Sequence, residues 1–439
     1  MHRTLLTWLS LIVVSATATI VRGEDELSRA AVDSITAAEL QEHVATLADD
    51  VFEGRGVGTR GGRAAGQYIV GQLRASTLQP AGTDDYYQTC DRGGRNILAL
   101  LPGSDPQLKG EYVVVGAHYD HVADGRMGHA NGPIGFIHNG ADDNASGCSA
   151  LLETIEALSD AKVAPRRSIL FAFWDGEEMG MLGSYRWVKS GSIAPNAVKM
   201  AINIDMIGRM REGRLEIDGT RSAYGLRRFL SRNDNPAMWL DFSWDLQANS
   251  DHWPFLERQI PVVLLHTGLH EDYHRPSDDA DKINRVGLEA ATRYLIDIVV
   301  AAADADTLPA YRPARRYESL AAQQSRDRRD AAVTSGAWPG AKPPRLGISW
   351  RTDEAEPGSV YLTFVAANSP AATAGLVAGD RIYKVNGQPF ADEGDFRDTV
   401  FGLLDASATG FTLEVESRGH IHAVDVQLPS EPLAKKSDL

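Results

Sequence analysis

SILFAFWDGEE, from Ser168 to Glu178, joins an apolar run to a group of carboxylates. Its first part, Ser168–Trp174, has the length and composition of a buried β-strand. Asp175, Glu177 and Glu178 follow at once, although a buried carboxylate is costly unless it is paired or binds a metal ion. The stretch therefore indicates either a surface turn or a site at the end of a sheet, and the rest of the chain decides between the two.

Strands and helices alternate along most of the chain around this stretch. Residues 24–79 are expected to be helical, with an interruption at Phe52–Gly62. After them we expect strands at Tyr112–Gly116, Ser168–Trp174, Lys199–Ile204 and Pro261–Leu265, and helices at Ser149–Leu158, Ser184–Ser190 and Val286–Ala303. Such alternation predicts an α/β domain with a largely parallel sheet that is covered on both faces.

Histidines and carboxylates follow the ends of these expected strands. In chain order they are His118, Asp120, Asp175, Glu177, Glu178, Asp205, His266, His270 and His274. Asp142 and Asp143 stand shortly before the helix expected from Ser149. Because sites in open α/β sheets form beyond the carboxyl ends of the strands, we expect these side chains to converge. Mixed histidine and carboxylate ligands suit Zn²⁺, and two such ions can share one carboxylate.

The adjacent Glu177 and Glu178 can divide two tasks between them. One carboxylate can bind a metal ion while its neighbour accepts a proton from a water molecule. Metal-assisted hydrolysis needs both, because the metal lowers the pKa of water from about 15.7 toward about 7 and a base then takes the proton. The sequence therefore favours a hydrolytic metal site over a surface turn.

Six motifs carry a resemblance to a known family. In chain order they are GAHYDH, HNGADDNASG, FWDGEEMGMLGS, INIDMIG, SDHWPF and YHRPSDDADKIN, and they fall within residues 40–303. In this order they resemble the motifs of the di-zinc metallopeptidases of family 28, which include leucyl-type aminopeptidases, glutamate carboxypeptidases and glutaminyl cyclases. The resemblance implies a three-layer α/β/α sandwich with a mostly parallel mixed sheet.

The same resemblance implies a set of metal ligands. By position, His118 and Asp205 would hold one zinc ion, and Glu178 and His274 would hold a second. Asp143, the second aspartate of its pair, would bridge both ions. All these positions carry the residue type that the family requires. The implied cofactor is therefore zinc, with two ions per chain.

The resemblance also assigns catalytic roles. Glu177 would be the general base, and Asp120 would lie behind His118 and orient its imidazole ring. Asp142 is expected to cap the following helix or to hydrogen-bond within its loop. The remaining histidines of this region are expected in loops at the rim of the pocket, and they are His121, His129 and His138.

The activity that the resemblance implies is that of an exported zinc-dependent exopeptidase. An aminopeptidase, which hydrolyses N-terminal residues from peptides, is favoured. A glutaminyl cyclase-like aminoacyltransferase, a carboxypeptidase and a dipeptidase remain alternatives, because the motifs do not show which end of the substrate is held. A binding protein on an inactive peptidase fold would have lost a ligand or the base, and none is lost here.

Charge and the first residues of the chain bear on partners and compartment. The formal net charge of −15 over 439 residues disfavours nucleic acid and anionic membranes as partners, because both select basic surfaces. Residues 1–23 have the polar start and the apolar stretch of a signal peptide. No later segment is long and apolar enough to cross a bilayer. We therefore expect a secreted or periplasmic protein whose partners are peptide substrates.

The two cysteines, Cys90 and Cys148, are expected as separate buried thiols. A disulfide between them is the alternative in an exported protein, because oxidising compartments permit such bonds.

The chain divides into a catalytic domain at residues 24–307, a linker at 308–343, a PDZ-like domain at 344–430 and a tail at 431–439. The PDZ-like domain resembles those attached to bacterial proteases, since Leu346-Gly347-Ile348 matches their carboxylate-binding loop. It would be a small β-rich domain that binds a peptide carboxyl terminus at a sheet edge. The alternative is a tail that packs on the catalytic domain and binds nothing.

Overall fold

The computed structural model describes residues 26–126, 129–232, 235–244, 246–334, 346–405 and 408–428. The expected signal peptide, the expected tail and residues 335–343 of the expected linker lie outside these ranges. The chain forms two compact units. The first contains the described residues up to Leu215 and then Gln247–Leu308, and the second contains Glu216–Leu246 and the described residues from Pro309 onward.

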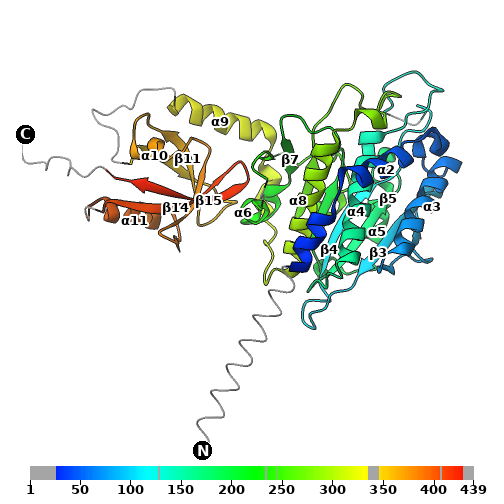
Figure 1. Ribbon diagram of the computed structural model, residues 1–439, viewed down its shortest axis with the longest axis horizontal. Coiled ribbons are helices and arrows are strands. Elements are labelled where there is room, and N and C mark those ends of the chain that lie inside the picture. Colours follow the sequence, from blue (N-terminus) through cyan, green and yellow to red (C-terminus); the bar gives the residue numbers. More distant parts are fainter. Residues whose placement is uncertain are drawn as a thin grey trace, which may run out of the picture. The chain divides into compact units, whose positions relative to one another are not determined.

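A mixed sheet forms the centre of the first unit (Figure 1). Its strands in this unit lie in the order β1-β3-β5-β4-β6-β9, and β2 pairs with β3. These strands are β1 Gln79–Pro80, β2 Tyr87–Thr89, β3 Arg95–Leu101, β4 Tyr112–His118, β5 Ser168–Trp174, β6 Val198–Ile204 and β9 Val262–His266. β4 runs parallel to β5 and β6, and β6 runs parallel to β9. β3 is antiparallel to its neighbours. Every residue of β5 is buried, as expected of a strand covered on both faces.

Helices cover both faces of this sheet. Among these helices are α2 Ala37–Leu47, α3 Arg60–Ala75, α4 Gly147–Asp160, α5 Leu182–Ser190, α7 Trp253–Glu257 and α8 Arg285–Asp304. α2, α4 and α8 pack against one another, whereas α5 packs against α7. The β4-α4-β5 and β5-α5-β6 crossovers run in opposite directions along the sheet, so right-handed connections place α4 and α5 on opposite faces. The predicted three-layer sandwich with a mostly parallel mixed sheet is confirmed.

The helical N-terminal part of the first unit is interrupted in the region where the sequence predicts an interruption. A helix covers residues 26–34, and a short 3-10 segment, η1 Asp50–Arg55, separates α2 from α3. Glu53, Gly54 and Arg55 have φ angles of 51°, 65° and 48°, which no right-handed helix permits. β3 was not predicted, because its Leu- and Ala-rich sequence suits helix and strand alike and only pairing with β5 decides between them.

The second unit contains a separate antiparallel sheet in the order β10-β11-β12-β14-β15, with β13 paired with β12. Its elements are β10 Ile348–Thr352, β11 Val360–Val365, α10 Pro370–Thr373, β12 Arg381–Val385, β13 Gln388–Pro389, α11 Glu393–Asp405, β14 Gly410–Ser417 and β15 His420–Gln427. Asn386 and Gly387 both have positive φ, as a two-residue hairpin turn between β12 and β13 requires. The small β-rich domain is therefore confirmed.

Two further strands and a helix join the second unit from the middle of the chain. β7 Arg214–Asp218 reaches into it, and α6 Leu226–Leu230 and β8 Trp239–Phe242 lie within it. The unit also contains η8 Pro313–Tyr317 and α9 Leu320–Thr334, which fall in the expected linker. The predicted domain boundaries stay a prediction, but they did not anticipate that Glu216–Leu246 groups with the second unit.

Both cysteines are buried and free, which confirms the separate thiols. Burial raises the pKa of Cys90 to about 11 and that of Cys148 to about 12, so neither is a reactive thiolate at neutral pH.

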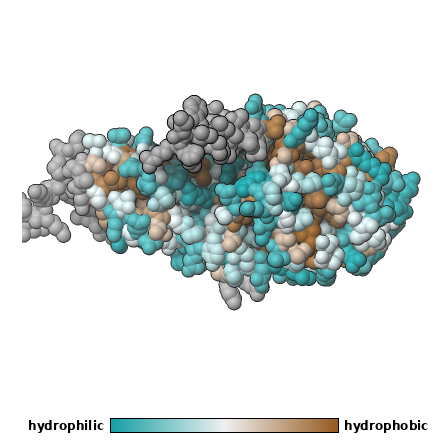
Figure 2. Space-filling model, turned by 90° about the horizontal axis from the view of Figure 1, so that it is seen from below, coloured by the Kyte–Doolittle hydropathy of each residue, from teal (hydrophilic) through white to brown (hydrophobic). Residues whose placement is uncertain are grey.

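None of the helices in the described ranges has the length and apolar character that a membrane span requires. On the face in Figure 2, hydrophilic residues surround separate apolar patches.

Candidate metal centre

The carboxyl ends of β4, β5, β6 and β9 lie at one edge of the first unit's sheet. β4 lies between β5 and β6 and is parallel to both, so the connections that follow these strands diverge to opposite sides. Ligands bind in open α/β sheets where the strand order reverses in this way. All the predicted metal ligands lie at or after these strand ends or just before α4, and they are His118, Asp143, Glu178, Asp205 and His274.

Three of these side chains form what we call the first group: His118, Asp143 and Asp205. Nε2 of His118 lies 3.2 Å from Oδ1 of Asp205 and 3.3 Å from Oδ1 of Asp143. Nδ1 of the same ring donates a hydrogen bond to the backbone carbonyl of Asp120 at 3.2 Å. Because a carbonyl only accepts, this bond fixes a proton on Nδ1 and directs Nε2 at the two carboxylates.

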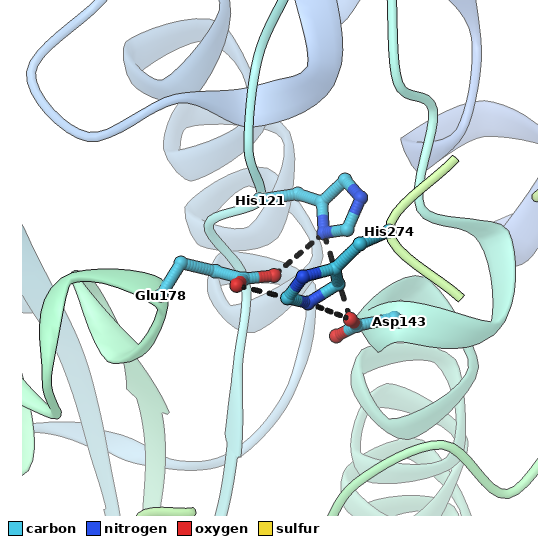
Figure 3. Close-up of side chains that lie close together, drawn as sticks. All are labelled: His121, Asp143, Glu178 and His274. Atoms are coloured by element: carbon cyan, nitrogen blue, oxygen red, sulfur yellow. Dashed lines mark hydrogen bonds and ion pairs between the residues drawn. The ribbon is translucent and has the colours of Figure 1, made fainter. Parts of the chain in front are cut away.

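The second group contains His121, Asp143, Glu178 and His274, which converge from separate segments (Figure 3). Nε2 of His274 lies 2.9 Å from Oδ2 of Asp143 and 3.1 Å from Oε2 of Glu178. Nδ1 of His274 donates to the backbone carbonyl of His129 at 2.9 Å. Nδ1 of His121 lies 2.8 Å from Oε1 of Glu178. The two groups share Asp143, with Oδ1 facing one and Oδ2 the other.

The separations within both groups match the edges of a metal coordination polyhedron. Ligands about 2.05 Å from a tetrahedral zinc ion lie about 3.3 Å from one another. The His118–Asp205 and His118–Asp143 distances of 3.2 and 3.3 Å agree with this edge, and the two His274 distances of 2.9 and 3.1 Å are slightly shorter. The donor set of imidazoles and carboxylates is the one that zinc takes in proteins.

In both groups, neighbouring carboxylates raise the affinity of the histidines for protons, which marks positions where cations fit. Burial alone would lower the pKa of His118, but Asp205, Asp120 and Asp143 outweigh it and raise that pKa well above its usual value. Burial is likewise outweighed at His274, where Asp143 and Glu178 raise the pKa to about 11. Hydrogen bonds from His118 and His274 overcome burial and hold the pKa of Asp143 well below its usual value. Two divalent cations would displace these protons and neutralise the same carboxylates, so the site fits zinc.

Glu177, the predicted base, and Asp120 lie beside the first group. Burial, with the negative charges of Asp251, Glu178 and Asp205, raises the pKa of Glu177 well above its usual value despite the opposing effect of His118. The carboxylate of Asp120 accepts the backbone N–H groups of Glu177 at 3.0 Å and Glu178 at 3.4 Å.

Oδ1 of Asp120 is also 3.7 Å from Nδ1 of His118. Asp120 therefore contacts both the turn that carries the two glutamates and the ring of His118, and its role in orienting that ring stays a prediction.

Hydrogen bonds fix the backbone around Asp143. Oδ2 of Asp278 accepts the N–H groups of Asp142 and Asp143 at 3.0 and 3.1 Å. Oδ1 of Asp142 accepts from the N–H of Gly208 at 2.6 Å and from Oγ of Ser146 at 3.1 Å. Asp142 therefore hydrogen-bonds within its loop, as expected, and neither described metal group includes it.

The burial of His121, His138 and Arg55 was not expected from the sequence. His121 and His138 were expected at the rim, but both are fully buried, and His121 belongs to the second group. Arg55 is fully buried and its guanidinium donates to backbone carbonyls on both sides of the site, including those of Tyr119 and Gly140, each at 2.8 Å. The place of His121 in the GAHYDH motif, close after His118, was the only local signal for it.

A third cluster in the first unit has a structural explanation. His43, Glu153 and Glu156 also lie close enough to hold an ion, with Glu156 exposed. Both ring nitrogens of His43 already have partners, however, because Nδ1 lies 2.7 Å from the hydroxyl of Tyr68 and Nε2 lies 3.2 Å from Glu153. The cluster links α2 to α3 and α4 and is satisfied without a metal.

Comparisons with known proteins indicate a peptidase family and a PDZ domain. The model of peptidase family M28 matches residues 96–299, and that of the PDZ domain matches residues 363–408. Leupeptin-inactivating enzyme 1 of Streptomyces exfoliatus is 28% identical over 240 residues, which cover 54% of this chain and 50% of that protein. Leucine aminopeptidase 2 of Trichophyton rubrum is 26% identical over 230 residues, which cover 46% and 43%. The chain thus spans no more than half the length of these two relatives.

Among solved structures, the LapA aminopeptidase of Legionella pneumophila matches with a TM-score of 0.54 at 17% identity. The match covers 64% of this chain and 75% of that one. At this level of identity the likeness supports the fold alone.

Proposed function

We propose that this chain, which contains a peptidase family M28 domain and a PDZ domain, is an exported zinc-dependent aminopeptidase. It would remove N-terminal residues from peptides. The division of the Asp143 carboxylate carries the proposal. Oδ1 lies 3.3 Å from Nε2 of His118, and Oδ2 lies 2.9 Å from Nε2 of His274. A carboxylate that faces two separate ligand groups suits two metal ions that share it.

The predicted ligands would hold zinc as two overlapping sets. His118, Asp205 and Asp143 would hold one ion, and Glu178, His274 and Asp143 would hold the other. Zinc in such a site acts as a Lewis acid on the scissile carbonyl and makes water a stronger acid. The three carboxylates offset most of the positive charge of two dications, which makes this arrangement acceptable in a buried site.

Glu177 would move the proton. Glu177 is half-buried, and burial together with the neighbouring carboxylates raises its pKa. Nearby dications would favour its ionised form, which can accept a proton from the attacking water and return it to the leaving amine. The carboxylate of Asp120 holds the Glu177 N–H at 3.0 Å and so positions the base.

Export and peptide recruitment complete the proposal. Export rests on the signal-like residues 1–23, which lie outside the described residues. The PDZ domain would receive the carboxyl terminus of a peptide by strand addition to its sheet. This interaction contributes no catalytic group.

Glu177→Gln is the variant that tests the proposed mechanism. It keeps the shape of the side chain and removes the proton acceptor. We expect kcat for an aminoacyl amide to fall by about 10²–10⁴-fold while the zinc content stays at two ions per chain. The matched control is Glu212→Gln, which changes an exposed glutamate and should leave turnover unchanged. Near-normal turnover by Glu177→Gln would remove this residue from the mechanism.

A substrate panel tests the polarity of cleavage. Peptides with a free amino terminus should be hydrolysed one residue at a time from that end, whereas peptides with a blocked amino terminus should resist. Cleavage of the blocked peptides from the other end would instead identify a carboxypeptidase. Cyclisation of an N-terminal glutamine with one zinc ion per chain would identify a glutaminyl cyclase.

A further inference from the structure

We infer that His121 is a fourth protein ligand of the metal ion in the second group, which makes that site coordinatively closed and leaves the first group as the open one. The inference rests on the proposed function, because it takes zinc as the ion at both groups. It adds a ligand that the resemblance did not imply. It also gives the two ions different tasks.

The position of the His121 ring supports the inference. Nδ1 lies 2.8 Å from Oε1 of Glu178 and 3.8 Å from Oδ2 of Asp143. The ligand atoms of all four side chains lie within 4.8 Å of one another. In Figure 3 the rings of His121 and His274 approach Glu178 and Asp143 from different directions. The two rings meet edge to face, with centroids 5.6 Å apart. Two nitrogens and two carboxylates at these separations bracket the edge of about 3.3 Å expected around tetrahedral zinc.

The backbone holds this ring in place without using Nδ1. His121 is fully buried, and its backbone N–H donates to the carbonyl of Arg55 at 3.3 Å. A Cβ atom at Gly140 would lie 2.6 Å from Cγ and Cδ2 of the His121 ring, so only glycine leaves room for it. Gly140 itself has a φ of 58° and begins the loop that carries Asp143. The ring is therefore seated sterically against the metal loop, as a preorganised ligand should be.

The first group lacks a comparable fourth member. In the described ranges it contains His118, Asp143 and Asp205 and no further histidine, cysteine or carboxylate that completes it. Oδ2 of Asp205 accepts a hydrogen bond from Oγ of Ser250 at 2.6 Å, which leaves Oδ1 for the metal. Catalytic zinc sites have three protein ligands and an open position, whereas structural sites have four. Substrate should therefore reach the first ion, while the second is held more tightly and orders Asp143.

Stepwise zinc binding tests the inference without measuring activity. Metal-free protein is titrated with zinc in the presence of a chromophoric chelator, and the two dissociation constants are fitted. We expect a tight and a weaker step in the unmodified chain. His121→Gln should weaken the tight step by about 100-fold or more, since even outer contacts of metal ligands change affinity 10–100-fold. It should leave the weaker step within about threefold.

Three further variants assign the two binding steps to the two groups. Asp205→Asn should weaken the other step and leave the tight one. His138→Gln changes a buried histidine of the same loop that belongs to neither group, and both steps should stay unchanged. In His121→Gly, added imidazole should restore the tight step, because a free ring can occupy the vacated position. Near-ultraviolet circular dichroism of each zinc-loaded variant checks that it is folded.

Cobalt provides a second readout. With one equivalent of Co²⁺ we expect the strong visible absorption of a four-coordinate ion, and His121→Gln should weaken it. An unchanged tight step and an unchanged cobalt spectrum in a folded His121→Gln would overturn the inference and leave His121 as a hydrogen-bond partner of Glu178. Failure of the unmodified chain to bind any zinc would instead overturn the proposed function, and this inference with it.

Discussion

Asp143 connects the two metal groups through single atoms. Its oxygens face different histidines, and its backbone N–H is held by Asp278 at 3.1 Å. Removing the carboxylate would leave two like charges without their shared counter-charge. The effect of such a loss on metal content can be measured directly.

We expect Asp143→Ala to hold fewer than two zinc ions per chain and to lose hydrolytic activity. The measurement is zinc content after gel filtration. Asp124→Ala is the control, because this loop aspartate pairs with Arg126 outside both groups. Two tightly held ions in Asp143→Ala would show that another carboxylate bridges them.

Asp353 is a buried carboxylate in the second unit whose charge is matched by two arginines. Its oxygens lie 2.6 Å from Nη1 of Arg221 and 2.9 Å from Nη2 of Arg381. Burial would raise the pKa of Asp353, but the two arginines outweigh burial and hold that pKa below its usual value. A carboxyl whose pKa is lowered by folding stabilises the protein above its unfolded pKa of about 3.9, and this contribution disappears as the pH falls below that value.

Asp353→Asn should therefore lower the free energy of unfolding of the second unit by about 3–5 kcal/mol at pH 7, because it leaves a buried charge partly unpaired. The difference from the unmodified chain should narrow below about pH 4. Urea unfolding at several pH values measures both effects. Asp398→Asn, which removes an exposed partner of Arg397, should change stability by no more than about 0.5 kcal/mol. A difference that stays constant down to pH 3 would contradict the assignment to charge.

At the scale of secondary-structure elements, Arg55 joins η1 to the loops that carry the ligands. Its guanidinium donates to five backbone carbonyls, which belong to Leu47, Tyr119, Asn139, Gly140 and Asp143. The planar fork of arginine can reach carbonyls on several sides at once, whereas the three donors of a lysine ammonium diverge from one atom. Arg55 therefore positions the loops after β4 and before α4 relative to each other.

Arg55→Lys should lower the free energy of unfolding by at least about 3 kcal/mol, because several buried carbonyls would lose their donors. It should also weaken zinc binding, although the hydrogen bonds of Arg55 go to backbone carbonyls and not to ligand side chains. Thermal unfolding and zinc titration give the two readouts. Arg63→Lys is the control, since this arginine donates to the carbonyl of Gly58 at an exposed position. Unchanged zinc affinity in a folded Arg55→Lys would limit Arg55 to a stabilising role.

At the scale of the whole molecule, the second unit is assembled from two distant parts of the chain. Nη2 of Arg228 lies 2.7 Å from Oε1 of Glu414, and Nε of Arg227 lies 2.8 Å from Oε2 of Glu416. Glu356 accepts the backbone N–H groups of both arginines at 2.8 and 3.3 Å. These carboxylates all come from the PDZ-like segment, so this segment pairs with the charges of Arg227 and Arg228.

A chain that ends at Pro343 should retain every predicted metal ligand and two zinc ions, and should still hydrolyse small aminoacyl amides. It should lose protection at Arg227 and Arg228, because their carboxylate partners are absent. We expect trypsin to cleave there at least about tenfold faster than in the full chain, while cleavage after the exposed Arg126 stays unchanged. Equal protection in both chains would show that residues 216–246 fold without the PDZ-like segment.

Local sequence patterns were sufficient for much of this protein. The strand at Ser168–Trp174, the acids after it and the Asn386-Gly387 turn are each specified within a few neighbouring residues, because strand burial and turn geometry depend on local residue types. The expected ligands His118, Asp143, Glu178, Asp205 and His274 came instead from the resemblance of six motifs to a known family. Strand geometry explains only why such side chains meet at one edge of the sheet.

Only the tertiary structure placed the partners that lie far apart along the chain. Arg55 and Gly140 are separated by 85 positions, and Arg227 and Glu416 by 189, and no local pattern encodes such contacts. His121 was read as a rim histidine because a histidine in a loop can point to solvent or inward with the same sequence. The space left by Gly140 and the burial of the second group decide the direction of its ring.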